Sequence, residues 1–179
     1  LLALPCETIH VCLSGNAEKI LIRIIEMCED SYEIVRHERT IALEGEEDVP
    51  FRFPKSVRPH DALVAFSKRK VLRLAAELET AHINTSIIYG ALPYQVRKEE
   101  VRKFLSGETE VLVSTDAIGM VMNLPIERIV FMEEEKYDVK DVRPLRMEEI
   151  RQIAGRAGRR GLYEKGYVNA FSGKDMILE

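Results

Sequence analysis

Three arginines lie within five positions of this chain, with glycines before, between and after them. The stretch is residues 152–161, with the sequence QIAGRAGRRG. Small residues let a ligand approach the backbone closely, and a guanidinium binds anionic oxygens through a planar fork of donors. The pattern therefore predicts a phosphate-binding site. A helix end with solvated cations would explain the charges but not the glycine spacing.

A second group of polar residues follows a predicted buried strand at residues 111–113. It contains the hydroxyl of Thr115, the carboxylate of Asp116 and the carboxamide of Asn123. Ligands of open α/β sheets gather at the carboxyl ends of the strands. Thr115 could hold a backbone phosphate, and Asp116 a ribose hydroxyl or an arginine. Asp116 could equally be a helix cap, and the local sequence leaves both interpretations open.

A third group follows the apolar run at residues 62–66. Ser67 offers a hydroxyl at the start of a predicted helix, and Lys68 begins a run of three cations. A helix amino terminus with adjacent cations favours phosphate. The alternative is a capped helix whose lysines are solvated.

The order of predicted elements indicates how these groups are positioned. Strands are predicted at residues 62–66, 83–89, 111–113, 126–132 and 167–171. Helices are predicted at residues 68–80, 94–105 and 147–154, the first of them with Val71, Leu72, Ala75 and Leu78 facing inward. Strands and helices that alternate at this spacing predict an α/β fold, a three-layer parallel sheet with flanking helices. The polar residues 133–146 are expected as an insertion and the acidic residues 44–50 as a solvated loop. Upstream we expect a strand at 9–13, a helix at 17–29 and a strand at 32–37.

Composition restricts the class of protein. The chain has 179 residues, 46% of them hydrophobic, and a net charge of -4, which argues against nucleic-acid binding by bulk charge but not against a local basic groove. Three cysteines without a C-x-x-C pair indicate a reducing compartment rather than a disulfide or zinc framework. No stretch approaches the ~18 apolar residues of a membrane span, so we expect no membrane partner. Because the chain does not begin with Met, it is expected to be cut from a longer protein.

Two common phosphate motifs are missing. The sequence has no G-x-x-x-x-G-K-[ST] loop and no acidic D-E-x-H box. The sequence thus contains cations that could bind a phosphate. It lacks the glycine-rich loop that holds a nucleotide and the acidic residues that hold its metal ion. Nucleotide hydrolysis needs both sets of groups.

The polar groups resemble motifs of the superfamily 2 helicases. Residues 115–124 resemble motif V and residues 152–159 motif VI; residues 66–68 resemble motif IV, and residues 88–93 the turn that follows it. The branch that looks most similar is the mitochondrial degradosome RNA helicase (Suv-three) type with its bacterial relatives. Val121 stands where that pattern has a second glycine, and a β-branched residue there restricts close approach to the backbone.

The resemblance implies a role for each matching residue. The residues implied to act on the nucleotide phosphates are Gln152, Arg156 and Arg159, with Arg159 as an arginine finger. Those implied to bind ATP are Asp116, Gly119, Asn123 and Gly155. Those implied to bind the nucleic-acid backbone are Ser67, Lys68, Gly90 and Thr115.

The resemblance also implies a domain organisation. Residues 61–179 would form the second RecA-like domain, without a P-loop of its own. Residues 1–30 would be the tail of the first RecA-like domain, and residues 31–60 a linker with a first strand region. ATP and Mg²⁺ would be held mainly by that first domain, so the fragment alone would be inactive.

The resulting hypothesis is the C-terminal lobe of an ATP-dependent RNA or DNA helicase, which works on a single strand together with its first RecA-like domain. Such a protein would be cytoplasmic in a bacterium, or mitochondrial in a eukaryote. The alternative is a non-catalytic RecA-like module that binds nucleic acid or a protein, with residues 133–138 as a partner surface. A small-molecule enzyme on a flavodoxin-like sheet is a third, more remote interpretation.

Overall fold

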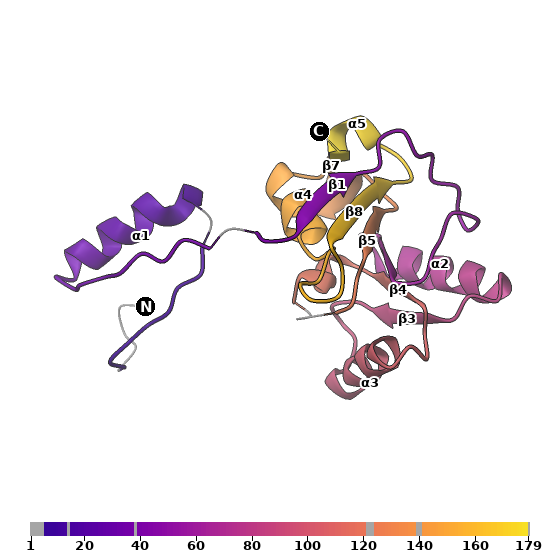
Figure 1. Ribbon diagram of the computed structural model, residues 1–179, viewed down its shortest axis with the longest axis horizontal. Helices are drawn as coiled ribbons and strands as arrows, with labels where there is room; N and C mark the ends of the chain where they lie inside the picture. Colours follow the sequence, from indigo (N-terminus) through magenta and orange to yellow (C-terminus); the bar gives the residue numbers. More distant parts are fainter. Residues whose placement is uncertain (1–5, 14, 38, 121–123, 139–140, 179) are drawn as a thin grey trace. The chain divides into compact units, whose positions relative to one another are not determined.

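The computed structural model describes residues 6–13, 15–37, 39–120, 124–138 and 141–178 (Figure 1). The chain divides into two compact units, residues 1–38 and residues 39–179. No helix within the described ranges is long and apolar enough to cross a membrane.

The first unit contains helix α1, Gly15–Met27, close to the predicted helix. An ion pair of 2.9 Å joins Arg36 to Glu18 of this helix. The strands predicted at residues 9–13 and 32–37 were wrong, because the described residues of this unit contain no strand. A strand needs a neighbour for its backbone hydrogen bonds, which local apolar sequence does not supply.

The second unit is built on a parallel sheet with the strand order β1-β8-β5-β2-β4-β3 (Figure 1). Its strands are β1 Ala42–Gly45, β2 Asp61–Val64, β3 Thr85–Ile88, β4 Val111–Ser114, β5 Arg128–Phe131 and β8 Lys165–Ala170. Each of the five strands predicted from residue 62 onward overlaps a strand of this sheet. Four of them correspond to the interior strands, β2, β4, β5 and β8, where apolar runs are buried on both faces. Strand β1 was not predicted, since residues 44–45 were assigned to an acidic loop.

Helices cover both faces of this sheet, which confirms the predicted three-layer α/β architecture. The helices are α2 Lys68–Thr80, α3 Tyr94–Leu105, α4 Met147–Ala154 and α5 Lys174–Leu178. Alternate strand residues face opposite layers. Leu112 of β4 packs in the core beneath α3, α4 and α5, whereas Val113 packs beneath α2 and the segment that joins β1 to β2.

Helix α2 illustrates how local sequence determines an element. The Ser67 hydroxyl accepts a hydrogen bond of 3.2 Å from the backbone N–H of Lys70 and caps the helix. Its buried face consists of Val71, Leu74, Ala75 and Leu78. The expectation for Leu72 was wrong: this side chain is 42% exposed, because i, i+3, i+4 and i+7 spacing from Val71 selects Leu74 instead.

The polar residues 133–146 contain an antiparallel hairpin that the sequence did not predict. Its strands are β6 Glu135–Asp138 and β7 Asp141–Pro144. Arg143 of the hairpin donates two hydrogen bonds of 2.8 Å to Glu149 of α4, and Lys136 pairs with the same carboxylate at 2.8 Å. Ion pairs with α4 thus hold the hairpin against the domain.

Candidate functional site

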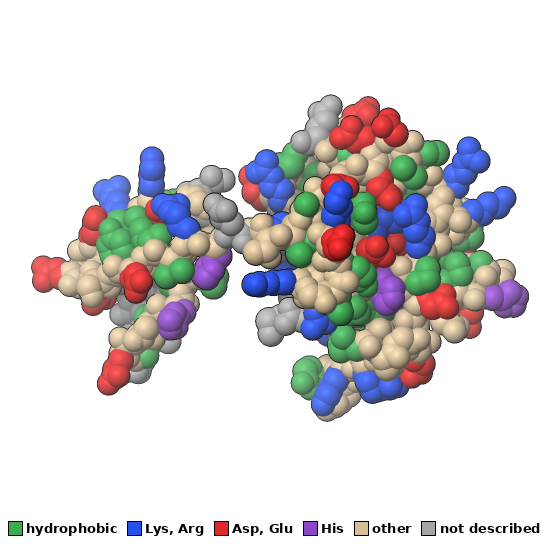
Figure 2. All heavy atoms as spheres, viewed as in Figure 1, with side chains coloured by type: hydrophobic (Ala, Val, Ile, Leu, Met, Phe, Trp, Pro, Cys, Tyr) green, Lys and Arg blue, Asp and Glu red, His purple; other side chains and the backbone are tan. Residues whose placement is uncertain are grey.

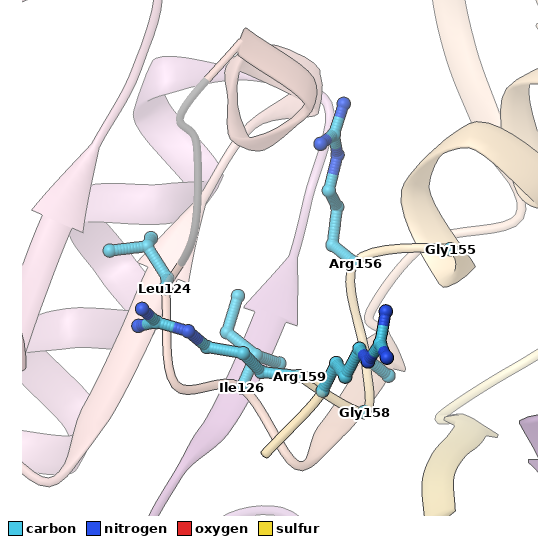
Figure 3. A pocket seen from close by; sticks show the side chains of 8 residues that line it. Leu124, Ile126, Gly155, Arg156, Gly158 and Arg159 are labelled. Atoms are coloured by element: carbon cyan, nitrogen blue, oxygen red, sulfur yellow. The ribbon is translucent and has the colours of Figure 1, made fainter. Parts of the chain in front are cut away.

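The arginines of the sequence motif lie in a loop that follows α4, residues 155–161, here named the arginine loop. A hollow of about 380 Å³ lies against this loop (Figure 3). Its lining residues are Leu124, Ile126 and residues 155–160. The predicted phosphate ligands therefore border an indentation of the surface rather than a smooth helix end.

Backbone contacts determine the path of the arginine loop. Gly158 has φ +74°, a left-handed conformation that favours glycine. Its N–H donates a hydrogen bond of 2.9 Å to the carbonyl of Ile126, which precedes β5. A Cβ atom on Gly158 would lie 2.7 Å from Ile41 and 2.8 Å from the nitrogen of Gly166. The glycine spacing thus fits close backbone packing within the domain.

Arg156 connects the arginine loop with the loop that follows β4. That loop is a 3-10 helix, η1, Asp116–Met120. The half-buried Arg156 donates from Nη2 a hydrogen bond of 2.6 Å to the carbonyl of Gly119. The Gln152 side chain lies over the same glycine, since a Cβ atom there would be 3.3 Å from the Gln152 Nε2. Two segments that the sequence singled out separately are therefore in contact.

The two candidate phosphate ligands of the loop point in different directions. The Arg159 guanidinium lies beside Leu124, whereas the Arg156 side chain extends away from it (Figure 3). The Arg156 Nε is buried and has no hydrogen-bond partner among the described residues. Asn123 and Val121, both singled out in the sequence, lie outside the described residues.

Thr115 and Asp116 take different environments at the start of η1. Thr115 is 8% exposed, and its Oγ1 accepts a hydrogen bond of 3.2 Å from the N–H of Ala117. The exposed Asp116 carboxylate lies 3.4 Å from Lys136 Nζ of the hairpin. The hydrogen bond to Glu149, together with the charge of Asp116, raises the pKa of Lys136. Thr115 therefore makes the local cap contact, and the Asp116 carboxylate faces outward.

Three predicted nucleic-acid contacts lie near the carboxyl ends of β2, β4 and β3. Lys68 follows β2, and its Nζ lies 5.0 Å from the centroid of the Tyr89 ring, next to Gly90. A Cβ atom on Gly90 would meet no atom within 4 Å. The N–H of Thr115 donates to the carbonyl of Ile88 at 3.0 Å. The end of one sheet thus gathers a cation, an open glycine and a hydroxyl, while the Ser67 hydroxyl serves as a cap.

The surface charge is mixed rather than uniformly basic. Figure 2 shows Lys and Arg side chains interspersed with Asp and Glu over the face of the second unit in view. Among the described residues, no group of three His, Cys, Asp or Glu side chains is arranged to hold a metal ion.

A buried ion network, which the sequence analysis missed, supports the sheet. Arg128 is 2% exposed and donates to both carboxylate oxygens of Asp61, at 2.9 and 2.6 Å, and to Glu46 at 2.8 Å. Although burial lowers the pKa of Arg128, the hydrogen bonds and charges of these two acids raise it above its usual value. The only sequence signal for this network was the pair of charges, Glu127 and Arg128, within a predicted strand.

The fold and the contacting loops define a RecA-like domain of the helicase type. Residues 48–161 match the sequence model of the family described as "Helicase conserved C-terminal domain". Because this match covers more than half of the chain, the chain belongs to that family.

The relatives include mitochondrial RNA helicases. "ATP-dependent RNA helicase SUV3, mitochondrial" of Candida albicans is 34% identical over 98% of this chain and 25% of that protein. "ATP-dependent RNA helicase SUV3L, mitochondrial" of Oryza sativa is 38% identical over 95% of this chain and 24% of that protein. The chain thus spans about a quarter of the length of these relatives. The predicted resemblance to this branch of superfamily 2 is confirmed.

Solved structures are similar in fold. The C-terminal part of the Fun30 ATPase domain matches with a TM-score of 0.53 and 14% identity, over 68% of this chain and 39% of that one. The C-terminal domain of Saccharomyces cerevisiae Dbp5 matches with a TM-score of 0.50 and 17% identity, over 68% of this chain and 67% of that one.

Proposed function

We propose that this chain is the second RecA-like lobe of an ATP-dependent RNA helicase and that it completes an ATP site built mainly by another lobe. The observation that carries the proposal is the hydrogen bond of 2.6 Å from Arg156 to Gly119. Gly119 lies in the segment that begins directly after Thr115. The 3-10 helix η1 therefore contacts the arginine loop. It also adjoins the end of the sheet where the predicted nucleic-acid contacts lie.

In this proposal the arginine loop acts on the nucleotide. Arg159 is the arginine finger that stabilises negative charge on the γ-phosphate during phosphoryl transfer. Arg156 also reaches the γ-phosphate, and Gln152 contacts the nucleotide. The buried Arg156 Nε has no partner within the described part of the chain, which supports this assignment, because such a donor is costly unless a ligand accepts from it. Asp116, Gly119, Asn123 and Gly155 complete the nucleotide side. ATP is the substrate that supplies the transferable phosphoryl group.

Ser67, Lys68, Gly90 and Thr115 would bind the backbone of a single strand. Lys68 supplies charge, and Gly90 leaves room for a phosphate to approach the main chain. Such binding is independent of base sequence and weakens as salt rises. A local site of this kind is compatible with the net charge of -4.

Mg²⁺ would be bound elsewhere, because no described group of acids here could ligate it. We assign it, with most of the contacts to ATP, to a first RecA-like lobe of which residues 1–30 would be the tail and residues 31–60 the linker. The names of the relatives support RNA rather than DNA as substrate and mitochondria as the compartment.

The ATPase rate, measured with and without single-stranded RNA, tests this proposal. The longer protein that contains this chain should hydrolyse ATP faster with RNA than with DNA of the same length. The 179-residue chain alone should hydrolyse none. A longer protein that binds RNA but shows no ATPase would instead favour the non-catalytic module.

A further inference from the structure

Arg39 contacts the arginine loop from a distant part of the sequence. Its Nη1 donates a hydrogen bond of 2.9 Å to the carbonyl of Gly155, and its Nη2 donates to the carbonyl of Ala157. Its Nε donates to the carbonyl of Ile41 at 2.6 Å. All three guanidinium nitrogens of Arg39 thus donate to main-chain carbonyl oxygens, and two of these oxygens belong to the arginine loop.

The two loop carbonyls belong to the residues on either side of Arg156. Gly155 is the C-cap of α4, and the last carbonyls at the end of a helix have no partner within the helix. A planar guanidinium can bind two such oxygens at a fixed separation, which an ammonium group cannot. Arg39 therefore restrains the peptide units that set the direction of the Arg156 side chain.

The same short segment also packs on the loop at Gly158. The Ile41 side chain would lie 2.7 Å from a Cβ atom on that glycine, so the two residues are in close contact. Arg39 is the first residue of the second unit, and Ile41 directly precedes edge strand β1. The chain that enters this domain is therefore fastened to the arginine loop before it joins the sheet.

We propose that Arg39 is a positioning residue for the arginine loop. It holds Arg156, and through the following residues Arg159, in the orientation needed to reach the nucleotide. This inference rests on the proposed function, but the contact it names can be measured without any activity. The described contacts of Arg39 are to neutral carbonyl oxygens, so its positive charge also adds to the attraction of the loop for phosphate.

Two measurements test the proposal with the variants Arg39→Ala and Arg39→Lys. Arg73→Ala is the matched control, since Arg73 lies on the exposed side of α2 and forms a local ion pair with Glu77, one turn along the same helix. In the 179-residue chain, hydrogen exchange should accelerate about tenfold at the amides of residues 155–160 in Arg39→Ala, with β4 amides unchanged. In the longer protein, kcat of the RNA-stimulated ATPase should fall by about tenfold to a hundredfold, with RNA affinity retained. Arg39→Lys should recover only part of the rate.

Three results would overturn the proposal: unchanged exchange in the loop, unchanged kcat in Arg39→Ala, or exchange that accelerates equally in β4, which would make Arg39 a merely structural residue. If Arg159→Ala leaves the ATPase intact, the proposed function fails instead. The exchange measurement then still decides whether Arg39 restrains the loop.

Discussion

Gly158 and Gly166 approach each other so closely that neither has room for a side chain. A Cβ atom on Gly158 would lie 2.8 Å from the Gly166 nitrogen, and one on Gly166 would lie 2.7 Å from the Gly158 nitrogen. Gly166 belongs to β8, in the interior of the sheet. The arginine loop is thus packed main chain against main chain on strand β8 of the sheet.

Replacement of Gly158 by alanine should therefore destabilise the domain more than the same change at Gly161. Both glycines have positive φ, +74° and +83°, so alanine costs about 1–2 kcal/mol of backbone strain at either position. At Gly161 a Cβ atom would meet nothing within 4 Å, whereas at Gly158 it would meet main-chain atoms. The free energy of unfolding in urea measures the difference. Equal losses for the two variants would show that the close packing does not constrain the loop.

The buried network around Arg128 makes a second prediction. Arg128→Ala leaves Asp61, which is 1% exposed, without its bidentate partner. Removing one member of a buried pair costs about 3–5 kcal/mol because the other charge stays buried. Denaturant unfolding of this variant, compared with the exposed Arg73→Ala, measures the cost. A loss no larger than that of the control would contradict it.

Local sequence predicted the elements whose ends and faces are determined locally. Helices α2, α3 and α4 have their predicted bounds because their apolar spacing lies within the segments themselves, and Ser67 caps α2. Strand β1 was missed because it is a short, mostly exposed edge strand, and its second half, residues 44–45, lies in the acidic run that was assigned to a loop. The hairpin was missed because the partner that stabilises it, Glu149, belongs to another element.

The candidate site was predicted only in part, for the same physical reason. The arginine loop and the segment after β4 were both found from residue types and spacing. Their contact through Gly119 could not be predicted, because it depends on how α4 packs. Arg39 gave no signal, because its partners in the arginine loop are main-chain carbonyls. They belong to Gly155 and Ala157, which lie 116 and 118 positions further along the chain.

Lys68→Ala should lower the affinity for single-stranded RNA. It should also make this affinity less dependent on the salt concentration. A lysine that contacts a phosphate releases a counterion, so its loss should make the slope of log K against log salt shallower by about 0.7. The weakening should be the same for different base sequences. Titrations of the longer protein at several salt concentrations measure the slope, with Lys55→Ala as a surface control. An unchanged slope for Lys68→Ala would remove this residue from the binding surface.

Glu149 should make stability depend on pH in the acid range. Hydrogen bonds from Arg143 in particular, and from Lys136 and the Arg146 backbone, hold the pKa of Glu149 well below its usual value. Because the folded pKa lies below that of the unfolded chain, near 4.3, the contribution is present above that pH and is lost as the pH falls below it. Glu149→Gln should therefore flatten the fall in unfolding free energy between about pH 5 and pH 3. A profile that matches wild type, with the exposed Glu79→Gln for comparison, would contradict this role.

The most direct test of the proposed lobe is the RNA-stimulated ATPase rate of the longer protein carrying Arg159→Ala, compared with Arg160→Ala. Arg160 adjoins Arg159, lines the same hollow and is exposed, so it controls for the loss of one charge. If Arg159 is the finger, kcat should fall by about 10³ to 10⁵ in its variant alone, with RNA binding and folding retained. Equal rates for the two variants would contradict the proposal that this domain completes the ATP site.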